Sequence, residues 1–310
     1  MKEYSILHRY LAVVVASLFC VVLLSVITTY SWSIQTLATQ DRATTKGLTL
    51  SPLRTELDIA PGTSLDGILT VTNSTDKPMK VSLSAEEFSV INQQYDYAFT
   101  EGSDLAKWVT FNPVGVELTV GESKKISFTV GVPLTAEPGG RYISLFAGTD
   151  TGVQDGGVNL RQRVASLLYI TVLGDVTRVG HLVSLSSPWA IAGKSMWSVA
   201  LQNRGTTHFR SRYSVQLYNL LGNGMAANMS GDALILPGTV RAVSDILPLP
   251  QLPGLYKIVY TIGLGDTPAV VETRFVLYIP PMFIILGVIV AMLLVSVLLR
   301  KRLNKKRQSV

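Results

Sequence analysis

Two long apolar runs, one near each end of the 310-residue chain, constrain its fold more than any other feature. No charged residue lies between Arg9 and Asp41, and Leu11–Ile27 is almost continuously apolar. Met282–Leu299 gives a second run of eighteen residues without a charge. Because runs of this length match the hydrocarbon core of a bilayer, the sequence predicts membrane segments at both ends. A wholly soluble cytoplasmic protein is excluded.

The first run is predicted to be a signal peptide or signal anchor over residues 1–38, with its apolar core at 11–27. Lys2 and Arg9 supply the positive charge that precedes such segments. The length of the run favours a permanent anchor, whereas the small residues Thr36 and Ala38 fit a cleavage site. Both alternatives remain open at this stage.

The second run predicts a transmembrane helix over 280–299, followed by a basic tail over 300–310. Since short loops rich in Lys and Arg stay in the cytoplasm, the tail is expected inside and residues 47–277 outside a plasma membrane. The tail is also expected to contact anionic lipid headgroups through its six basic residues, which are Arg300, Lys301, Arg302, Lys305, Lys306 and Arg307.

The net charge of +6 does not indicate a nucleic-acid-binding protein, because the excess comes from the two ends. Between the apolar runs there are nineteen Lys and Arg residues against twenty Asp and Glu residues. No general basic surface is therefore expected there to neutralise phosphates. The single cysteine, Cys20, excludes a disulfide scaffold and a thiolate-ligated zinc protein.

Short alternating segments fill the chain between the runs, and Lys125–Val132 is one example. Turn signals such as Pro61-Gly62 and Pro138-Gly139-Gly140 separate these segments. This spacing is typical of antiparallel sandwiches. The predicted fold is all-β, with two tandem immunoglobulin-like β-sandwich domains flanked by the N-terminal signal or anchor helix and the C-terminal transmembrane helix.

A strand-turn-strand unit occurs twice and predicts where the two extracellular sandwiches divide. A predicted strand ends at Asn73 in the first half and at Asn203 in the second, and a later glycine turn and strand follow each. The predicted domains are 47–175 and 176–277. Both asparagines are interpreted as structural, because an Asn side chain at a strand end can bond local backbone.

The two halves differ in charge: residues 47–175 carry fifteen acids and nine bases, and residues 176–277 carry four acids and eight bases. A basic second domain suits an anionic lipid or wall polymer, with Arg204, Arg210 and Arg212 close together in sequence. A solvated face is the simpler interpretation of the same residues.

Several segments of the sequence resemble those of the WxL-interacting protein family of bacterial surface proteins. They are Leu50–Gly62, Val71–Pro78, Trp108–Pro113, Leu118–Lys125 and Pro133–Tyr142. The resemblance implies an export signal, a first sandwich that binds peptidoglycan, a second that binds a host, one transmembrane helix and a short basic tail. No residue-level ligand motif carries over.

Motifs for catalysis are absent from the sequence. It has no Gly-x-Ser-x-Gly, His-Glu-x-x-His or P-loop pattern, and His181 and His208 are interpreted as strand or turn residues. A glycan hydrolase needs convergent carboxylates, but the neighbours Glu86 and Glu87 point to opposite faces of a strand. The chain is therefore predicted not to be an enzyme, and no cofactor or metal is expected.

Aromatic residues supply the candidate contact site. Tyr95, Tyr97 and Phe99 alternate, which predicts that all three lie on one face of a strand, either in the core or in contact with a ligand. Core positions are predicted for three other aromatic residues, Trp108, Trp189 and Trp197.

The leading hypothesis is a non-catalytic, membrane-anchored bacterial cell-surface protein whose sandwiches bind a cell-wall polymer or another surface protein. Its expected partners are the lipid bilayer and either peptidoglycan or a surface protein. The alternative is an accessory or chaperone-like subunit that docks an exported enzyme or secretion-system partner through an exposed sheet edge.

Overall fold

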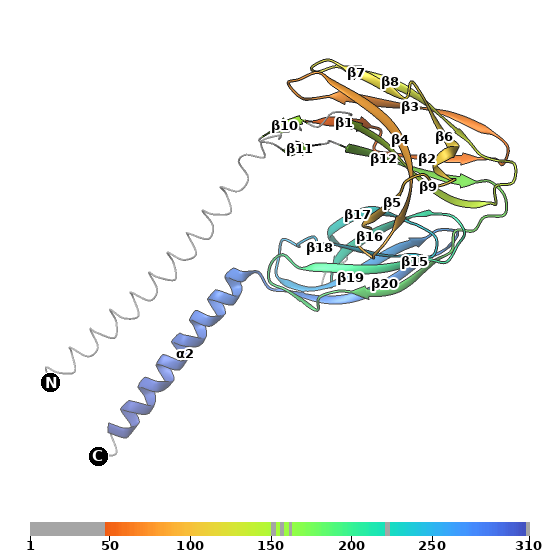
Figure 1. The fold of residues 1–310 in the computed structure, drawn as a ribbon. Helices are drawn as coiled ribbons and strands as arrows, with labels where there is room; N and C mark the ends of the chain where they lie inside the picture. The colour runs from red at the N-terminus through yellow and green to blue at the C-terminus, as the bar shows by residue number, and fades with distance from the viewer. Residues whose placement is uncertain (1–46, 150–152, 156–157, 161–162, 221–223, 308–310) are drawn as a thin grey trace. The chain divides into compact units, whose positions relative to one another are not determined.

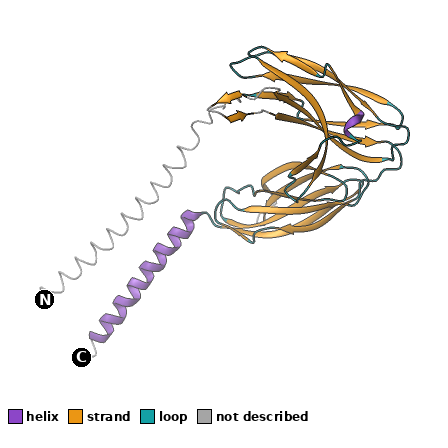
Figure 2. Ribbon diagram, in the orientation of Figure 1, coloured by secondary structure: helices purple, strands orange, loops and turns teal. Residues whose placement is uncertain are grey.

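The computed structural model describes residues 47–149, 153–155, 158–160, 163–220 and 224–307 (Figure 1). The predicted signal or anchor segment, residues 1–38, lies outside the described residues. Strands account for most of the described chain, and the helical parts are the short 3₁₀ turn η1 (Ala106–Trp108) and the helix α2 (Pro281–Arg307) (Figure 2).

The first sandwich is built from two sheets with the strand orders β1-β3-β8-β6 and β2-β12-β9-β4-β5, and β7 also pairs with β4. β2 runs parallel to β12, and β10 and β11 form a separate hairpin. The strands are β1 (Leu48–Ser51), β2 (Arg54–Ile59), β3 (Ser64–Asn73), β4 (Met79–Val90), β5 (Tyr97–Thr100), β6 (Val109–Asn112), β7 (Gly115–Leu118), β8 (Ser123–Gly131), β9 (Gly139–Thr149), β10 (Val153–Asp155), β11 (Val158–Leu160) and β12 (Arg163–Val172).

Alternation in the sequence explains why these segments form half-buried strands. In β8 the side chains of Ile126, Phe128 and Val130 are buried, whereas the residues between them are exposed or half-buried. They pack with residues of the opposite sheet, such as Ile143 and Leu168, in one core. A period of two thus places one face of each sheet inside the sandwich.

The second sandwich has sheets of the order β13-β15-β18 and β14-β20-β19-β16-β17 around its own core. The predicted all-β fold with immunoglobulin-like sandwiches is confirmed. The strands are β13 (Gly180–Ser186), β14 (Ala190–Ile191), β15 (Met196–Asn203), β16 (Phe209–Asn219), β17 (Met225–Ile235), β18 (Val240–Ile246), β19 (Gly254–Leu264) and β20 (Thr267–Tyr278).

The three tryptophans predicted in the core divide into two groups. Trp197 is buried in the second core, and Trp108 is half-buried against the first. Trp189 is 80% exposed, so its predicted core position is wrong. It directly precedes the two-residue strand β14, which is too short to extend the alternating pattern over it.

The repeated strand-turn-strand unit is present in both sandwiches. Asn73 ends β3 and Asn203 ends β15, and both side chains are fully buried. The backbone carbonyl of Asn73 accepts a hydrogen bond of 2.9 Å from the N–H of Gly121. The backbone carbonyl of Asn203 accepts one of the same length from the N–H of Gly238. Both glycines have a positive φ, 74° and 70°, which a residue with a Cβ adopts only with strain.

The asparagine side chains close these turns. The Asn73 amide donates to the carbonyls of Lys77 at 2.8 Å and Thr119 at 3.0 Å. The Asn203 amide donates to the carbonyls of Thr207 at 2.9 Å and Ile235 at 2.8 Å. The structural interpretation of both asparagines is therefore confirmed.

Among the described residues, α2 is the helix long and apolar enough to cross a membrane, with a mean hydropathy of 2.8 over Pro281–Leu298. The helical backbone continues to Arg307, so most of the predicted tail is helical. β20 ends at Tyr278, and only two residues separate it from α2.

We expect Asn203→Ala to lower the free energy of unfolding by about 1–3 kcal/mol, because two buried carbonyls lose their donor. Urea unfolding of the detergent-solubilised chain measures the change. The neighbouring Gln202→Ala removes a solvent-exposed hydrogen bond to Arg204 and should change stability by less than about 0.5 kcal/mol. Equal stability of the two variants would contradict the structural role of Asn203.

Candidate functional site

The sheet β2-β12-β9-β4-β5 turns one face to the first core and carries aromatic side chains on the other. Along β12, Leu168 and Ile170 enter the core, and Tyr169 between them points to the opposite face. We call this opposite surface the aromatic face, and its six rings belong to Phe88, Tyr97, Phe99, Tyr142, Phe146 and Tyr169.

The six rings contact one another across four strands. The ring of Phe88 lies at centroid distances of 5.3 Å from Tyr97, 5.7 Å from Tyr142 and 5.4 Å from Tyr169. Phe99 contacts Phe146 edge to face at 5.1 Å. Such edge contacts are favourable for aromatic pairs, so the face is an ordered surface.

The second sandwich covers one part of the aromatic face. Leu234 and Leu236, at the end of β17 and just after it, are buried in one cluster with Phe88 and Tyr169. The ring of His208, just before β16, lies 5.5 Å from that of Tyr169. These contacts form the junction between the sandwiches.

Another part of the aromatic face stays accessible. We call it the open patch and define it by Tyr97, Phe99, Arg163 and Leu167, which are half-buried or exposed. The Arg163 guanidinium lies 3.4 Å from the centre of the Phe146 ring and forms an ion pair with the buried carboxylate of Glu86. The patch thus combines exposed ring surface with a fixed cation.

Tyr95 does not share the strand face predicted for it together with Tyr97 and Phe99. The turn between β4 and β5 interrupts the alternation, because the Asp96 N–H bonds to the Asn92 side chain. Tyr95 adopts a φ of 69° in this turn and is only 5% exposed. The prediction of one shared face is wrong for Tyr95, whereas Tyr97 and Phe99 lie on one side of β5 with ring centroids 6.4 Å apart.

Tyr95 instead joins the two sandwiches. Its hydroxyl oxygen accepts a hydrogen bond of 2.8 Å from the backbone N–H of Leu236 and shares one of 2.7 Å with the hydroxyl of Thr239. The Arg241 guanidinium covers its ring at 4.4 Å. Nearby, the Ala242 N–H donates to the Gln93 carbonyl at 2.8 Å. The turn is therefore a part of the junction and not a free contact surface.

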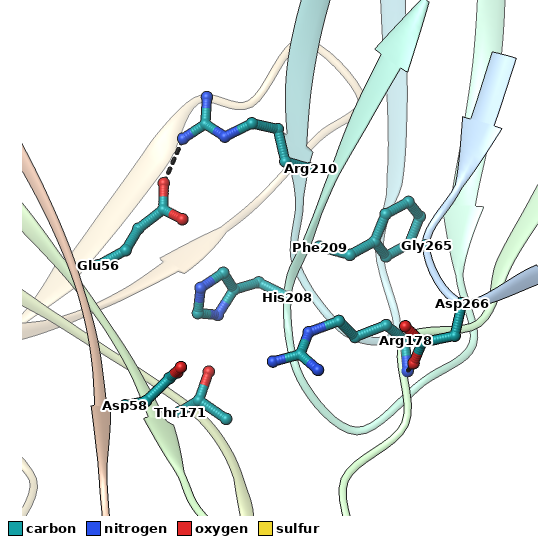
Figure 3. Close-up of a pocket in the computed structure, with 9 residues that line it drawn as sticks. All are labelled: Glu56, Asp58, Thr171, Arg178, His208, Phe209, Arg210, Gly265 and Asp266. Carbon is teal, nitrogen blue, oxygen red and sulfur yellow. Dashed lines mark hydrogen bonds and ion pairs between the residues drawn. The ribbon is translucent and has the colours of Figure 1, made fainter.

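A charged pocket of about 300 Å³ lies at the same junction (Figure 3). Arg210 of β16 forms an ion pair with Glu56 of β2 across the junction and a second one with Asp232 of β17. In Figure 3 the His208 ring points from the second sandwich toward Asp58 and Thr171 of the first. Glu56 is paired with Arg210, and the Asp266 carboxylate accepts a hydrogen bond from the backbone N–H of Arg178.

Burial lowers the pKa of His208 to about 4, and the nearby arginines Arg178 and Arg210 act in the same direction. The carboxylates of Glu56 and Asp58 oppose the shift without cancelling it. His208 is thus neutral near pH 7 and packs as an uncharged ring against Tyr142 and Tyr169. The interpretation of His208 as a turn residue is confirmed, and His181 lies exposed on β13.

The basic residues Arg300, Lys301, Arg302, Lys305, Lys306 and Arg307 lie on the helical backbone at the end of α2. Their contact with lipid stays a prediction. In the described part of the chain, no group of three or more His, Cys, Asp or Glu residues is placed to hold a metal ion.

No family model matches the chain, and no curated protein matches it. Solved structures similar to it include the class 5 fimbriae chaperone CfaA, at 10% identity over 74% of this chain and 99% of the other, with a TM-score of 0.39. Another is the CsuC–CsuE chaperone–tip subunit complex of Acinetobacter baumannii, at 13% identity over 75% and 99% of the two chains, with a TM-score of 0.36.

A third similar structure is the Salmonella enterica SafA pilin with the SafB chaperone, at 11% identity over 74% and 96% of the two chains, with a TM-score of 0.35.

Sequence reasoning did not find the junction residues, which come from distant segments. Glu56 and Arg210 are 154 positions apart, and each is an ordinary charged residue on an alternating strand. The opposite charges of the two halves were the one available signal. They indicate attraction between the sandwiches but not which residues meet.

We expect Tyr95→Phe to lower the free energy of unfolding by about 1–3 kcal/mol, because the buried Leu236 N–H loses its acceptor. Urea unfolding of the solubilised chain reports the loss. Tyr97→Phe is the matched control, since the Tyr97 hydroxyl has a long contact of 3.5 Å with that of Tyr169 and should matter less. If Tyr97→Phe were the more damaging change, the bridging role of Tyr95 would be wrong.

Acid should weaken the junction through His208. Its pKa is about 4 when folded and near 6.5 when unfolded, so the unfolded chain takes up the proton first. The contribution of neutral His208 to the free energy of unfolding is complete above pH 6.5. It falls by about 1.4 kcal/mol per pH unit from 6.5 toward 4. Unfolding measured across this range should show a smaller slope for His208→Asn than for the unchanged chain. His181→Asn, at an exposed position, should keep the original slope.

Proposed function

We propose that the chain is an exported, membrane-anchored bacterial protein that acts by binding another protein of the cell surface through the open patch. The apolar helix α2 followed by basic residues supports anchoring with the C-terminus in the cytoplasm. In this proposal both sandwiches face outward. No catalytic step is assigned to them.

The observation that carries the proposal is the edge strand β5, which itself carries the exposed aromatic rings. β5 stands at the end of the strand order β2-β12-β9-β4-β5 and pairs with β4 over Tyr97–Thr100. The outer edge of β5 therefore has no strand partner among the described residues. An extended segment of a partner can add to such an edge through backbone hydrogen bonds. Tyr97 and Phe99 would then contact its side chains.

A wall polymer is the second candidate, and it is the ligand that the resemblance to WxL-interacting proteins implies. The exposed ring of Phe99, tilted by 40° against that of Tyr97, favours it, because sugars stack on accessible aromatic rings. The two candidates use the same patch but differ in their need for the strand edge.

We expect Phe99→Ala combined with Arg163→Ala to reduce partner capture by roughly tenfold or more, since aromatic and arginine anchors carry much of the energy of an interface. A photo-crosslinking residue at Glu101, exposed just after the end of β5, identifies the partner in the chain's own cells and leaves Phe99 in place. The amount of this partner that each variant captures then measures the loss of binding. Ile68→Ala, at an exposed apolar position on β3 in the other sheet, is the matched control.

Co-sedimentation of the same variants with purified cell-wall sacculi separates the two candidates. Retention on sacculi that needs Phe99, without a crosslinked protein, would favour the wall polymer. Unchanged behaviour of the double variant in both assays would exclude the open patch as the binding surface. Tyr95 is left intact throughout, because it belongs to the junction.

A further inference from the structure

Trp189 is the most exposed tryptophan side chain that the structure describes, and it lies next to the end of β20. Its backbone carbonyl accepts a hydrogen bond of 2.9 Å from the N–H of Leu277. Two residues further on, the carbonyl of Ile191 accepts a bond of 2.9 Å from the N–H of Ile279. Trp189 is thus fixed to the last residues before α2.

Further exposed apolar side chains gather at this end of the second sandwich. Leu277 is paired directly with Leu255 of β19, and Phe275 lies two residues earlier on the same face of β20. Leu252 lies in the loop before β19, and Met196 begins β15, with four residues between it and β14. We call this surface the proximal end, and its members are Trp189, Met196, Leu252, Leu255, Phe275 and Leu277, all exposed.

The proximal end is tied closely to α2. Only Ile279 and Pro280 separate Tyr278, the last residue of β20, from Pro281, the first of α2. Three Cα steps span at most about 11 Å, so the linker cannot carry the sandwich far from the helix (Figure 1). Where α2 enters a bilayer, the proximal end must lie near the headgroups.

The chemistry of the proximal end fits that position. Trp is favoured where a membrane meets water, because its ring is apolar and its N–H is polar. The exposed Lys194 and Lys257 lie beside the apolar side chains, in the turn before β15 and on β19, and suit anionic headgroups. Asp245, next to the end of β18, is the one exposed acid close in sequence to these strand ends.

We propose that the proximal end of the second sandwich docks onto the lipid surface and inserts Trp189 and its apolar neighbours into the interfacial layer of the membrane. The proposal rests on the membrane anchoring proposed above. It adds that the sandwich is held against the bilayer and does not swing freely on its linker. The contact sets how far from the membrane the open patch is presented.

Fluorescence of the full chain in vesicles of equal parts phosphatidylcholine and phosphatidylglycerol tests the docking. Trp32→Phe is present in every sample, and the difference between chains with and without Trp189→Phe isolates the Trp189 signal. Lipid brominated on its acyl chains should quench this signal at least about twofold, since an interfacial ring lies against those chains. Val120→Trp, at an exposed position in the first sandwich, adds a ring that should not be quenched.

Leu277→Glu should reduce the quenching of Trp189, because a carboxylate disfavours insertion next to it. Val271→Glu is the matched control, at an exposed apolar position on the same strand and six residues further from the helix. Equal quenching in both variants would overturn the proposal.

A third arm separates docking from anchoring. Leu286→Trp, in a chain that carries Trp189→Phe, places a reporter within α2. Quenching at position 286 without quenching of Trp189 overturns the docking alone. No quenching at position 286 overturns the anchoring, and the docking with it. Shielding of Trp189 from acrylamide without quenching by brominated lipid also overturns the docking and favours a protein on this surface.

Discussion

The hydroxyl of Tyr95 accepts a hydrogen bond from the backbone N–H of Leu236, and this contact belongs to the junction that covers part of the aromatic face. A free hairpin tip would leave the aromatic face exposed to water. The turn instead places Tyr95 under the Arg241 guanidinium and against Thr239. Buried polar groups must find partners, so this pairing defines one relative position of the strands that meet there.

The aromatic face is consequently divided between two roles. Rings around Phe88 and Tyr169 are covered by β17 and stabilise the junction by burial. Rings around Phe99 remain accessible beside Arg163. Aromatic rings of the same kind are thus buried in the junction on one part of the face and accessible on the other, because the second sandwich covers only one part.

Charge and apolar surface are also distributed unequally over the second sandwich. Arg210, which looked available for lipid or polymer, is engaged by Glu56 and Asp232. Exposed apolar side chains collect at the end that leads into α2, with Trp189 the most exposed among them. In a soluble protein such a collection usually marks a contact surface. The proposed docking onto a lipid surface would cover these side chains.

The sequence by itself determined the all-β fold, the repeated asparagine turns and the apolar helix, because periodicity, turn residues and hydrophobic length are local properties. It placed Tyr97 and Phe99 together for the same reason. Only the tertiary structure decided that Tyr95 is a bridge, that Trp189 is exposed and that His208 is buried and neutral. Each of these outcomes depends on which distant segment covers the side chain, and alternation along one strand carries no information about that cover.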